Sequence, residues 1–240
     1  MTTACIVQAR MGSTRLPGKV LRRLGDDTVL RHVLRRCAAI PGVDVVVCAT
    51  VVGADGERVA AEALRSGALV FRGDEADVLG RYLGAAEMVD ATRIMRVTSD
   101  CPLIDPVLCG RVLALCGGAN GADFATNNMP PSWPHGLDCE AFTRDLLEAA
   151  AATAEASYDR EHVSPWMQQA AGVRRANLAG PGGELTQHRW TLDYPEDFAF
   201  FAALFPLLPP PPALPGMEQV LDVLAMHPGL SRLNQHRSAA

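Results

Sequence analysis

The chain lacks the features of a disulfide-stapled or zinc-binding protein. Its cysteines number seven, no two form a CxxC pair, and most lie within apolar runs. Zinc sites and disulfide frameworks need paired cysteines, so we expect buried free thiols in a reducing compartment. The sequence does not open on a basic stretch followed by an apolar one, and we therefore expect no signal peptide and a cytoplasmic protein.

An excess of positive charge and an uninterrupted membrane span are also missing. Lysine and arginine number 22 against 27 aspartate and glutamate residues, a formal net charge of −5. This balance argues against binding nucleic acid by phosphate neutralisation. Residues 198–217 carry no charge and are long enough for a transmembrane helix. They contain six prolines, however, which the interior of a helix does not tolerate. We expect neither a nucleic acid nor a membrane partner, and interpret 206–240 as a proline-rich connector, a helix and a tail.

Strand-like apolar runs alternate with amphipathic, helix-like stretches along most of the chain. This alternation predicts an α/β fold: a Rossmann-like, mostly parallel mixed sheet with helices on both faces and ligands at the carboxyl ends of the strands. We expect one domain over 1–240, with an irregular α/β insertion at about 127–165. The expected strands are 5–8, 43–50, 68–71, 92–98, 173–178 and 187–193, and the expected helices are 28–40, 55–66, 76–89, 105–115, 143–156, 158–171 and one from 195.

A loop rich in glycine and cations follows the first expected strand, over residues 8–19. It holds two glycines, a proline, two arginines and a lysine. Backbone N–H groups and three cations suit a polyphosphate. The spacing is not that of the P-loop, because five residues separate Gly12 from Gly18 and Val20 follows Lys19 where a hydroxyl is needed. The alternative is an ordinary loop with solvated charges.

Two aspartates stand where expected strands end. Asp100 and Asp193 each come directly after a buried run, and each is followed within two residues by a proline. Magnesium takes one or two carboxylates together with phosphate oxygens, which this pair and the loop supply. Either aspartate alone could instead cap a turn or helix. We predict Asp100 and Asp193 as ligands of Mg²⁺. The acidic residues 196 and 197 suit a helix N-terminus whatever the function.

The motifs together resemble one enzyme family. The loop 7–19, the segments 98–106 and 191–197, and shorter matches between them resemble the spore-coat-polysaccharide-type cytidylyltransferases, in order over about residues 4–200. These are relatives of the acylneuraminate and 3-deoxy-manno-octulosonate cytidylyltransferases. The resemblance implies a GT-A-like nucleotidyltransferase fold and transfer of CMP from CTP to a small acidic acceptor, with release of pyrophosphate.

The resemblance also implies roles for individual residues. Catalytic roles fall to Arg15, Lys19, Asp100 and Asp193. The expected nucleotide-binding residues are Gln8, Ala9, Arg10, Met11, Gly12, Ser13, Arg15, Lys19, Thr50, Asp77, Arg81 and Ser99. The expected acceptor-binding residues are Asn127, Asp138, Glu140, Glu161, His162 and Arg189.

The acceptor stays open between a sugar acid, such as a nonulosonic acid, and a small phosphonate or phosphate. A sugar hydroxyl needs a base, for which His162 is a candidate, although a structural role suits this histidine equally well. Relatives are commonly homodimers, and the region 127–165 is the expected arm. Five arginines could bind an acidic group or be surface charge: Arg72, Arg160, Arg174, Arg175 and Arg189.

Two other functions fit parts of the pattern. A metal-dependent nucleotide-sugar glycosyltransferase would also bind its nucleotide at strand ends, but it generally carries an Asp-x-Asp motif. The run Asp100-Cys101-Pro102 lacks the second aspartate. A non-catalytic nucleotide-binding protein would be expected to lack a metal ligand or loop cation, and none is missing here.

Overall fold

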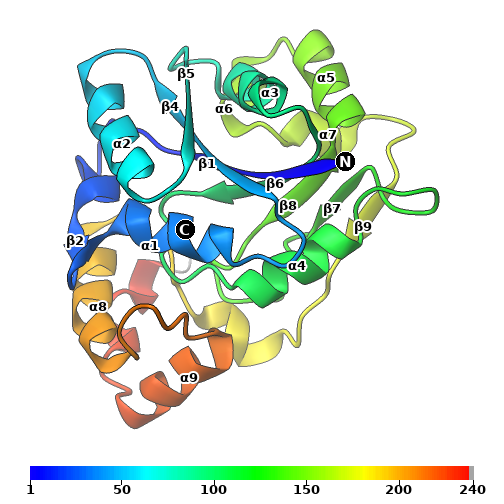
Figure 1. Cartoon of the computed structure of the whole chain (residues 1–240). Coiled ribbons are helices and arrows are strands. Elements are labelled where there is room, and N and C mark those ends of the chain that lie inside the picture. Colours follow the sequence, from blue (N-terminus) through cyan, green and yellow to red (C-terminus); the bar gives the residue numbers. More distant parts are fainter. Residues whose placement is uncertain (238–240) are drawn as a thin grey trace.

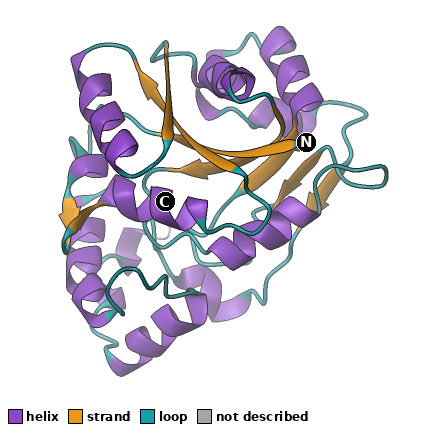
Figure 2. Ribbon diagram, in the orientation of Figure 1, coloured by secondary structure: helices purple, strands orange, loops and turns teal. Residues whose placement is uncertain are grey.

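A seven-stranded sheet forms the centre of the computed structural model, which describes residues 1–237 (Figures 1 and 2). The strand order is β5-β4-β1-β6-β8-β7-β9. Four of the six pairings are parallel, and β8 runs antiparallel to both of its neighbours. The predicted mostly parallel mixed sheet is therefore confirmed. The strands are β1 (Thr2–Gln8), β4 (Val45–Val51), β5 (Leu69–Gly73), β6 (Ala91–Thr98), β7 (Phe124–Thr126), β8 (Glu140–Thr143) and β9 (Arg175–Asn177), beside a hairpin of β2 (Arg23–Leu24) and β3 (Asp27–Thr28).

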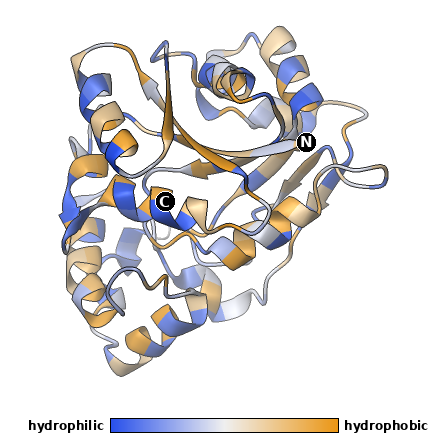
Figure 3. Cartoon of the chain, viewed as in Figure 1, coloured by the Kyte–Doolittle hydropathy of each residue, from blue (hydrophilic) through white to orange (hydrophobic). Residues whose placement is uncertain are grey.

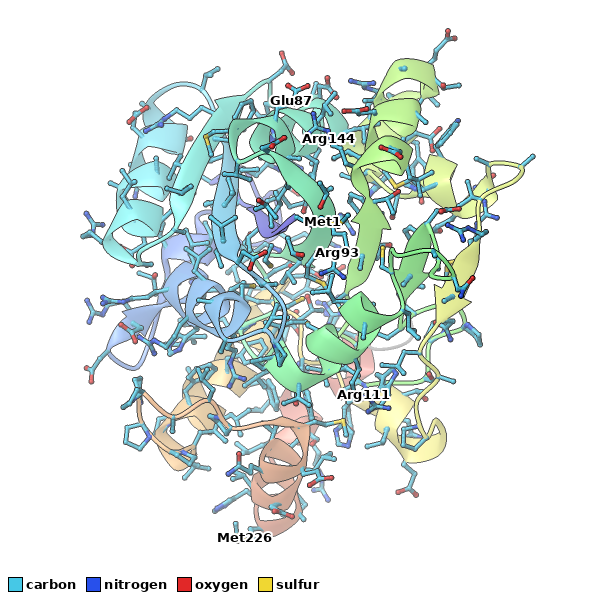
Figure 4. All side chains as sticks on the ribbon, turned by 45° about the vertical axis from the view of Figure 1, so that its right-hand side comes forward. Met1, Glu87, Arg93, Arg111, Arg144 and Met226 are labelled. Carbon is cyan, nitrogen blue, oxygen red and sulfur yellow. The ribbon has the colours of Figure 1, made fainter. Side chains whose placement is uncertain are left out.

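Helices cover both faces of the sheet, as predicted (Figure 1). One face carries α1 (Val29–Ala38), α2 (Ala54–Arg65) and α4 (Pro106–Ala114). The other carries α3 (Val78–Met88), α5 (Arg144–Thr153), α6 (Ser157–His162) and α7 (Pro165–Gln169). Glu87 and Arg144, labelled in Figure 4, link α3 to α5 at 3.6 Å. Short 3₁₀ turns complete the chain: η1 (Lys19–Leu21), η2 (Gly183–Gln187), η3 (Phe205–Leu207), η4 (Ser231–Leu233) and η5 (Gln235–Arg237).

The central strands are apolar on both faces because both faces are covered. In β1, Cys5 and Val7 pack into the cluster under α1, α2 and α4, whereas Ala4 and Ile6 pack into the cluster under α3 and α5. Successive side chains of a strand point to opposite faces, so a strand between two helical layers needs a continuous apolar run. Figure 3 shows these apolar strands between helices with one hydrophobic and one hydrophilic side.

A third apolar cluster lies beside the sheet and contains the C-terminal helices α8 (Pro195–Leu204) and α9 (Met217–Met226). Trp190, Leu192, Phe200 and Phe201 are all buried in it. Within residues 1–237, no helix combines the length and the apolar composition that a bilayer span requires.

Three expectations about secondary structure were wrong. Residues 187–193 are not a strand: Arg189 makes one isolated bridge with His135, and the apolar residues that follow pack against α8. The predicted helix 158–171 is broken between α6 and α7, at Val163 and Pro165. The strands β7 and β8 were missed because runs of three and four residues carry too little alternation to stand out.

Gly84 of α3 should be sensitive to substitution because a Cβ there would lie 2.2 Å from the Phe71 ring of β5. We expect Gly84→Ala to lower the free energy of unfolding by about 1–3 kcal/mol through overpacking, despite the better helix propensity of alanine. Urea denaturation measures the change. The control is Gly229→Ala, where a Cβ meets nothing within 4 Å. Equal stability of the two variants would contradict this packing.

Candidate active site

The loop after β1 folds back on itself and delivers Lys19. The carbonyl of Met11 accepts hydrogen bonds from the N–H groups of Ser13 at 3.0 Å and Gly18 at 3.1 Å. Gly18 has a φ of 66°, and a Cβ there would lie 3.1 Å from the Met11 side chain. Both observations favour glycine at this position. The tight turn places Lys19 at the start of η1, next to the carboxyl edge of the sheet.

Lys19 joins the two strand-end aspartates. Its Nζ lies 2.8 Å from Asp100 Oδ2 and 2.9 Å from Asp193 Oδ1. Asp100 lies two residues after the end of β6, and Asp193, 93 residues later, lies two residues before the start of α8. Lys19 is the single lysine of the sequence. The two carboxylates that the sequence pointed to therefore face one cation.

Lys19 and Asp100 stabilise each other in their charged forms. Burial lowers the pKa of Lys19, but the charges of Asp100 and Asp193 outweigh it, and the net pKa is raised. Burial likewise raises the pKa of Asp100, and the nearby Lys19 ammonium more than offsets this and lowers it. Two carboxylates that face one cation could also hold a magnesium ion. Within residues 1–237 no cluster of three or more potential ligand side chains is present, so water and phosphate oxygens would supply the remaining ligands.

A cleft of about 360 Å³ opens over these groups. It is lined by the loop after β1, the end of β6, the start of α3 and the end of α6. Thirteen of the residues predicted for the site line it: Gln8, Ala9, Arg10, Gly12, Ser13, Arg15, Lys19, Arg81, Ser99, Asp100, Glu161, His162 and Asp193. Thr14, Val20, Val78 and Thr98 line it as well and were not predicted.

Three residues predicted to bind nucleotide lie outside this lining. Met11 packs against the apolar core, and Thr50 is fully buried with no partner for its hydroxyl. Asp77 accepts a hydrogen bond from the Gly80 N–H at 2.8 Å and from Arg160 Nε at 2.9 Å. Asp77 thus caps α3 and ties α3 to α6. Its position supports a structural role rather than the predicted contact with the nucleotide.

Asp77→Asn should separate these two roles. Burial raises the pKa of Asp77, but Arg160 and the Gly80 N–H outweigh it and lower the pKa. A carboxylate with a lowered folded pKa stabilises the fold above its unfolded pKa, about 3.9, and loses this contribution as the pH falls through the folded pKa. We expect a loss of about 1 kcal/mol at pH 7 for this partly exposed pair, shrinking below about pH 4.

Urea denaturation at several pH values measures that difference, and calorimetry measures the affinity for CTP. We expect the affinity for CTP to be unchanged in Asp77→Asn. Weaker CTP binding with unaltered stability would restore Asp77 to the nucleotide site.

Four of the predicted acceptor residues also lie outside the cleft lining. Asn127 bridges Leu137 O at 2.8 Å and Cys139 N at 2.9 Å, which holds the turn before β8. Glu140 accepts hydrogen bonds from Arg96 and Ser164, both at 2.8 Å. The remaining two are Asp138, whose pKa is raised by burial, and Arg189, which binds Asp193 and Asp197.

Glu161 and His162 reach the cleft through a strained turn. Val163 has φ 72° and ψ −56°, and the Ser164 N–H donates to His162 O at 2.8 Å, which makes a γ-turn. A β-branched residue in this region is a genuine backbone outlier. Val163 is fully buried, so packing holds the turn in place. Such strain is concentrated at functional sites, which fits two cleft-lining residues directly before it.

The five arginines considered for an acidic acceptor all bind groups of the chain itself. Arg72 pairs with Glu57, Arg174 with Asp123, and Arg175 donates to backbone carbonyls. Arg160 and Arg189 hold Asp77 and Asp197 as described above. Arg10 also contacts carboxylates of the chain, Glu75 at 3.7 Å and Glu161 at 3.4 Å, but it lines the cleft and its side chain is 40% exposed.

Asp197 lies at the N-terminus of α8, as its place after Pro195 predicted, but its contact with Asp193 was not predicted from the sequence. Asp197 is fully buried, and its Oδ2 accepts the N–H groups of Asp193 and Tyr194, both at 2.9 Å. The Tyr194 hydroxyl accepts a hydrogen bond from Arg15 at 2.9 Å, which raises the pKa of Arg15. An acidic residue after a proline is typical of any helix N-terminus, so only burial distinguishes Asp197.

Comparison with known proteins agrees with this geometry. The sequence model of the family described as cytidylyltransferase matches residues 4–196. The spore coat polysaccharide biosynthesis protein SpsF of Bacillus subtilis is 33% identical over 207 residues, covering 83% of this chain and 85% of that protein. A cytidylyltransferase structure from Leptospira borgpetersenii superposes with a TM-score of 0.89 at 29% identity, covering 96% and 97% of the two chains.

A more distant structure shares the fold. It is a CMP:2-keto-3-deoxy-manno-octonic acid synthetase in complex with CTP, with a TM-score of 0.63 and 19% identity over 86% of this chain and 99% of that one. The family match covers far more than half of the sequence and includes both aspartates and the loop. The chain therefore belongs to the cytidylyltransferase family, whose members are CTP-dependent nucleotidyltransferases.

Proposed function

We propose that this protein transfers CMP from CTP to a small acidic acceptor and releases pyrophosphate, with Mg²⁺ bound at Asp100 and Asp193. The observation that carries the proposal is the contact of Lys19 with both carboxylates at the floor of a cleft lined by Arg10 and Arg15. A bound triphosphate needs cations to offset its charge, an open cleft beside the loop, and carboxylate oxygens to hold its magnesium ion.

The reaction makes specific demands on charge. Attack on the α-phosphorus develops negative charge on its non-bridging oxygens and on the departing pyrophosphate. Lys19 and Arg15 offset this charge from positions that are already ordered, Lys19 by two carboxylates and Arg15 by Tyr194. A bound magnesium ion would polarise the phosphoryl oxygens as a Lewis acid.

The base pocket follows from the same cleft. Gln8 at the end of β1 and Arg81 of α3 both line it, and each has a buried polar atom without a partner, Oε1 and Nε respectively. An acceptor and a donor of this kind match the amino group and the carbonyl oxygen of cytosine. We assign the pyrimidine to this side and the acceptor to the side of Glu161 and His162.

The acceptor is proposed to be a sugar acid or a small phosphonate. Arg10, half exposed at the rim, is the cation available to its acidic group once Glu75 and Glu161 release it. A sugar hydroxyl would need His162 as a base, whereas a phosphonate or phosphate is already anionic and needs none. We also propose that the protein forms a homodimer through residues 127–165.

Thermal unfolding with magnesium and each of CTP, UTP, ATP and GTP tests the function without an acceptor. Ligand at 100 times its Kd adds about 2.7 kcal/mol of stability, enough to raise the midpoint by several degrees. We expect the rise with CTP. A rise with UTP alone would favour the glycosyltransferase, and no rise with any nucleotide would contradict the proposed function. Pyrophosphate release from CTP, screened over acidic acceptors, then identifies the substrate.

A further inference from the structure

The chain end packs against the segment that carries Asp193. This C-terminal segment, residues 231–237, follows α9 and reaches residues 189–197. Asn234 is only 2% exposed, and its Nδ2 donates to Arg189 O and to Asp197 Oδ1, both at 2.9 Å. A buried amide with both N–H groups bound has one orientation, so the segment is locked onto this loop.

Asp197 transmits this contact to Asp193. Its second oxygen holds the backbone N–H of Asp193 at 2.9 Å, and both oxygens bind the Arg189 guanidinium at 2.9 and 3.0 Å. Arg189 in turn donates to Asp193 Oδ2 at 3.1 Å. Asn234 therefore orders Asp197 and Arg189, which fix the backbone and one carboxylate oxygen of Asp193. The other oxygen, Oδ1, faces Lys19.

Arg237 makes a second link, to the loop after β1. Its guanidinium carbon lies 4.2 Å from the centroid of the Tyr194 ring, and it donates to Glu196 at 2.9 Å. Arg15 packs on the same ring at 4.8 Å and donates to the Tyr194 hydroxyl. The ring of Tyr194 thus connects the C-terminal segment to a cation of the cleft.

We propose that Asn234 and Arg237 are positioning residues of the active site, Asn234 for Asp193 and Arg237 for Arg15. This inference rests on the proposed function, which gives Asp193 and Arg15 their roles. Groups that orient metal ligands typically change affinity or activity 10–100-fold when removed. Asn234 and Arg237 therefore act on the site through Asp193 and Arg15, although neither of them lines the cleft.

Two binding measurements on the full-length protein test the inference without an acceptor. Manganese titration followed by electron paramagnetic resonance reports on the two aspartates, and calorimetry reports on CTP binding with magnesium. We expect Asn234→Ala to weaken manganese binding about tenfold. We expect Arg237→Ala to leave manganese binding unchanged and to weaken CTP binding by about three- to tenfold, with Arg237→Lys in between because lysine keeps the charge but not the flat stacking group. Arg232→Ala, an exposed arginine of the same segment, is the matched control.

The outcomes separate the inference from the proposed function. A wild-type protein that binds no CTP would overturn the function and, with it, the roles assigned here. Normal wild-type binding together with unchanged affinities in both variants would overturn the inference alone. Variants that only lower the unfolding temperature, as a purely structural segment would, overturn it in the same way. Should Asn234→Ala fail to fold, Arg237→Ala decides, because the Arg237 side chain is partly exposed.

Discussion

Replacing Lys19 by methionine should lower the rate of CMP transfer by about 10²–10³-fold, the usual cost of removing one preorganised donor that stabilises transition-state charge. Methionine matches the length of the side chain but removes the ammonium that lies 2.8 and 2.9 Å from the two carboxylates. Pyrophosphate release from CTP in the presence of the identified acceptor measures the rate.

The same variant should bind manganese more tightly in the absence of nucleotide. Asp100 then loses the cation that contacts it, while Asp193 keeps only its arginine partners, which favours a divalent cation in place of the ammonium. Lys19→Arg is the control, since it keeps the charge while changing the shape of the donor. Full activity in Lys19→Met would exclude Lys19 from the chemistry. Weaker manganese binding would mean that the two carboxylates are not the metal ligands.

Asp100→Asn should abolish the stabilisation that CTP and magnesium give together. At 100 times the wild-type Kd this stabilisation is about 2.7 kcal/mol, or about 5–10 °C for a chain of this size. The substitution removes one of the two carboxylates available to the magnesium ion. Lys19 keeps its ion pair with Asp193, so its ammonium is not left without a counter-ion. Thermal unfolding with and without ligand measures the loss.

Asp123→Asn is the matched control for Asp100→Asn. Asp123 pairs with Arg174 and precedes β7, at the end of the sheet opposite the cleft. Asp123→Asn should therefore slightly lower the unfolding midpoint measured without ligand and leave the rise of the midpoint with CTP unchanged. A rise with CTP that survives in Asp100→Asn would remove this aspartate from the metal site.

The site residues that could be predicted from the sequence are those that directly follow strands along the chain. Residues 9–19 follow strand β1 and Asp100 follows strand β6. These strands pair in parallel, so the side chains had to meet at one edge of the sheet. Glycines, prolines and cations directly after a strand can be recognised in the sequence and predict a ligand-binding loop. Thr50 and Asp77 lie outside the cleft lining, because a residue near that edge can equally turn into the core or cap a helix.

The sequence by itself determined the α/β layering, the loop after β1 and the two carboxylates that Lys19 joins, since periodicity and strand ends specify these through local backbone geometry. Only the tertiary structure decided which charged side chains are held by partners within the chain and which can bind a ligand. Arg160 holds the partly exposed Asp77, and Arg189 holds the fully buried Asp197. Asn234 and Arg237 reach the site from the C-terminal segment. Such pairings depend on how loops distant in sequence pack together, and burying a charge requires a partner that no local pattern names.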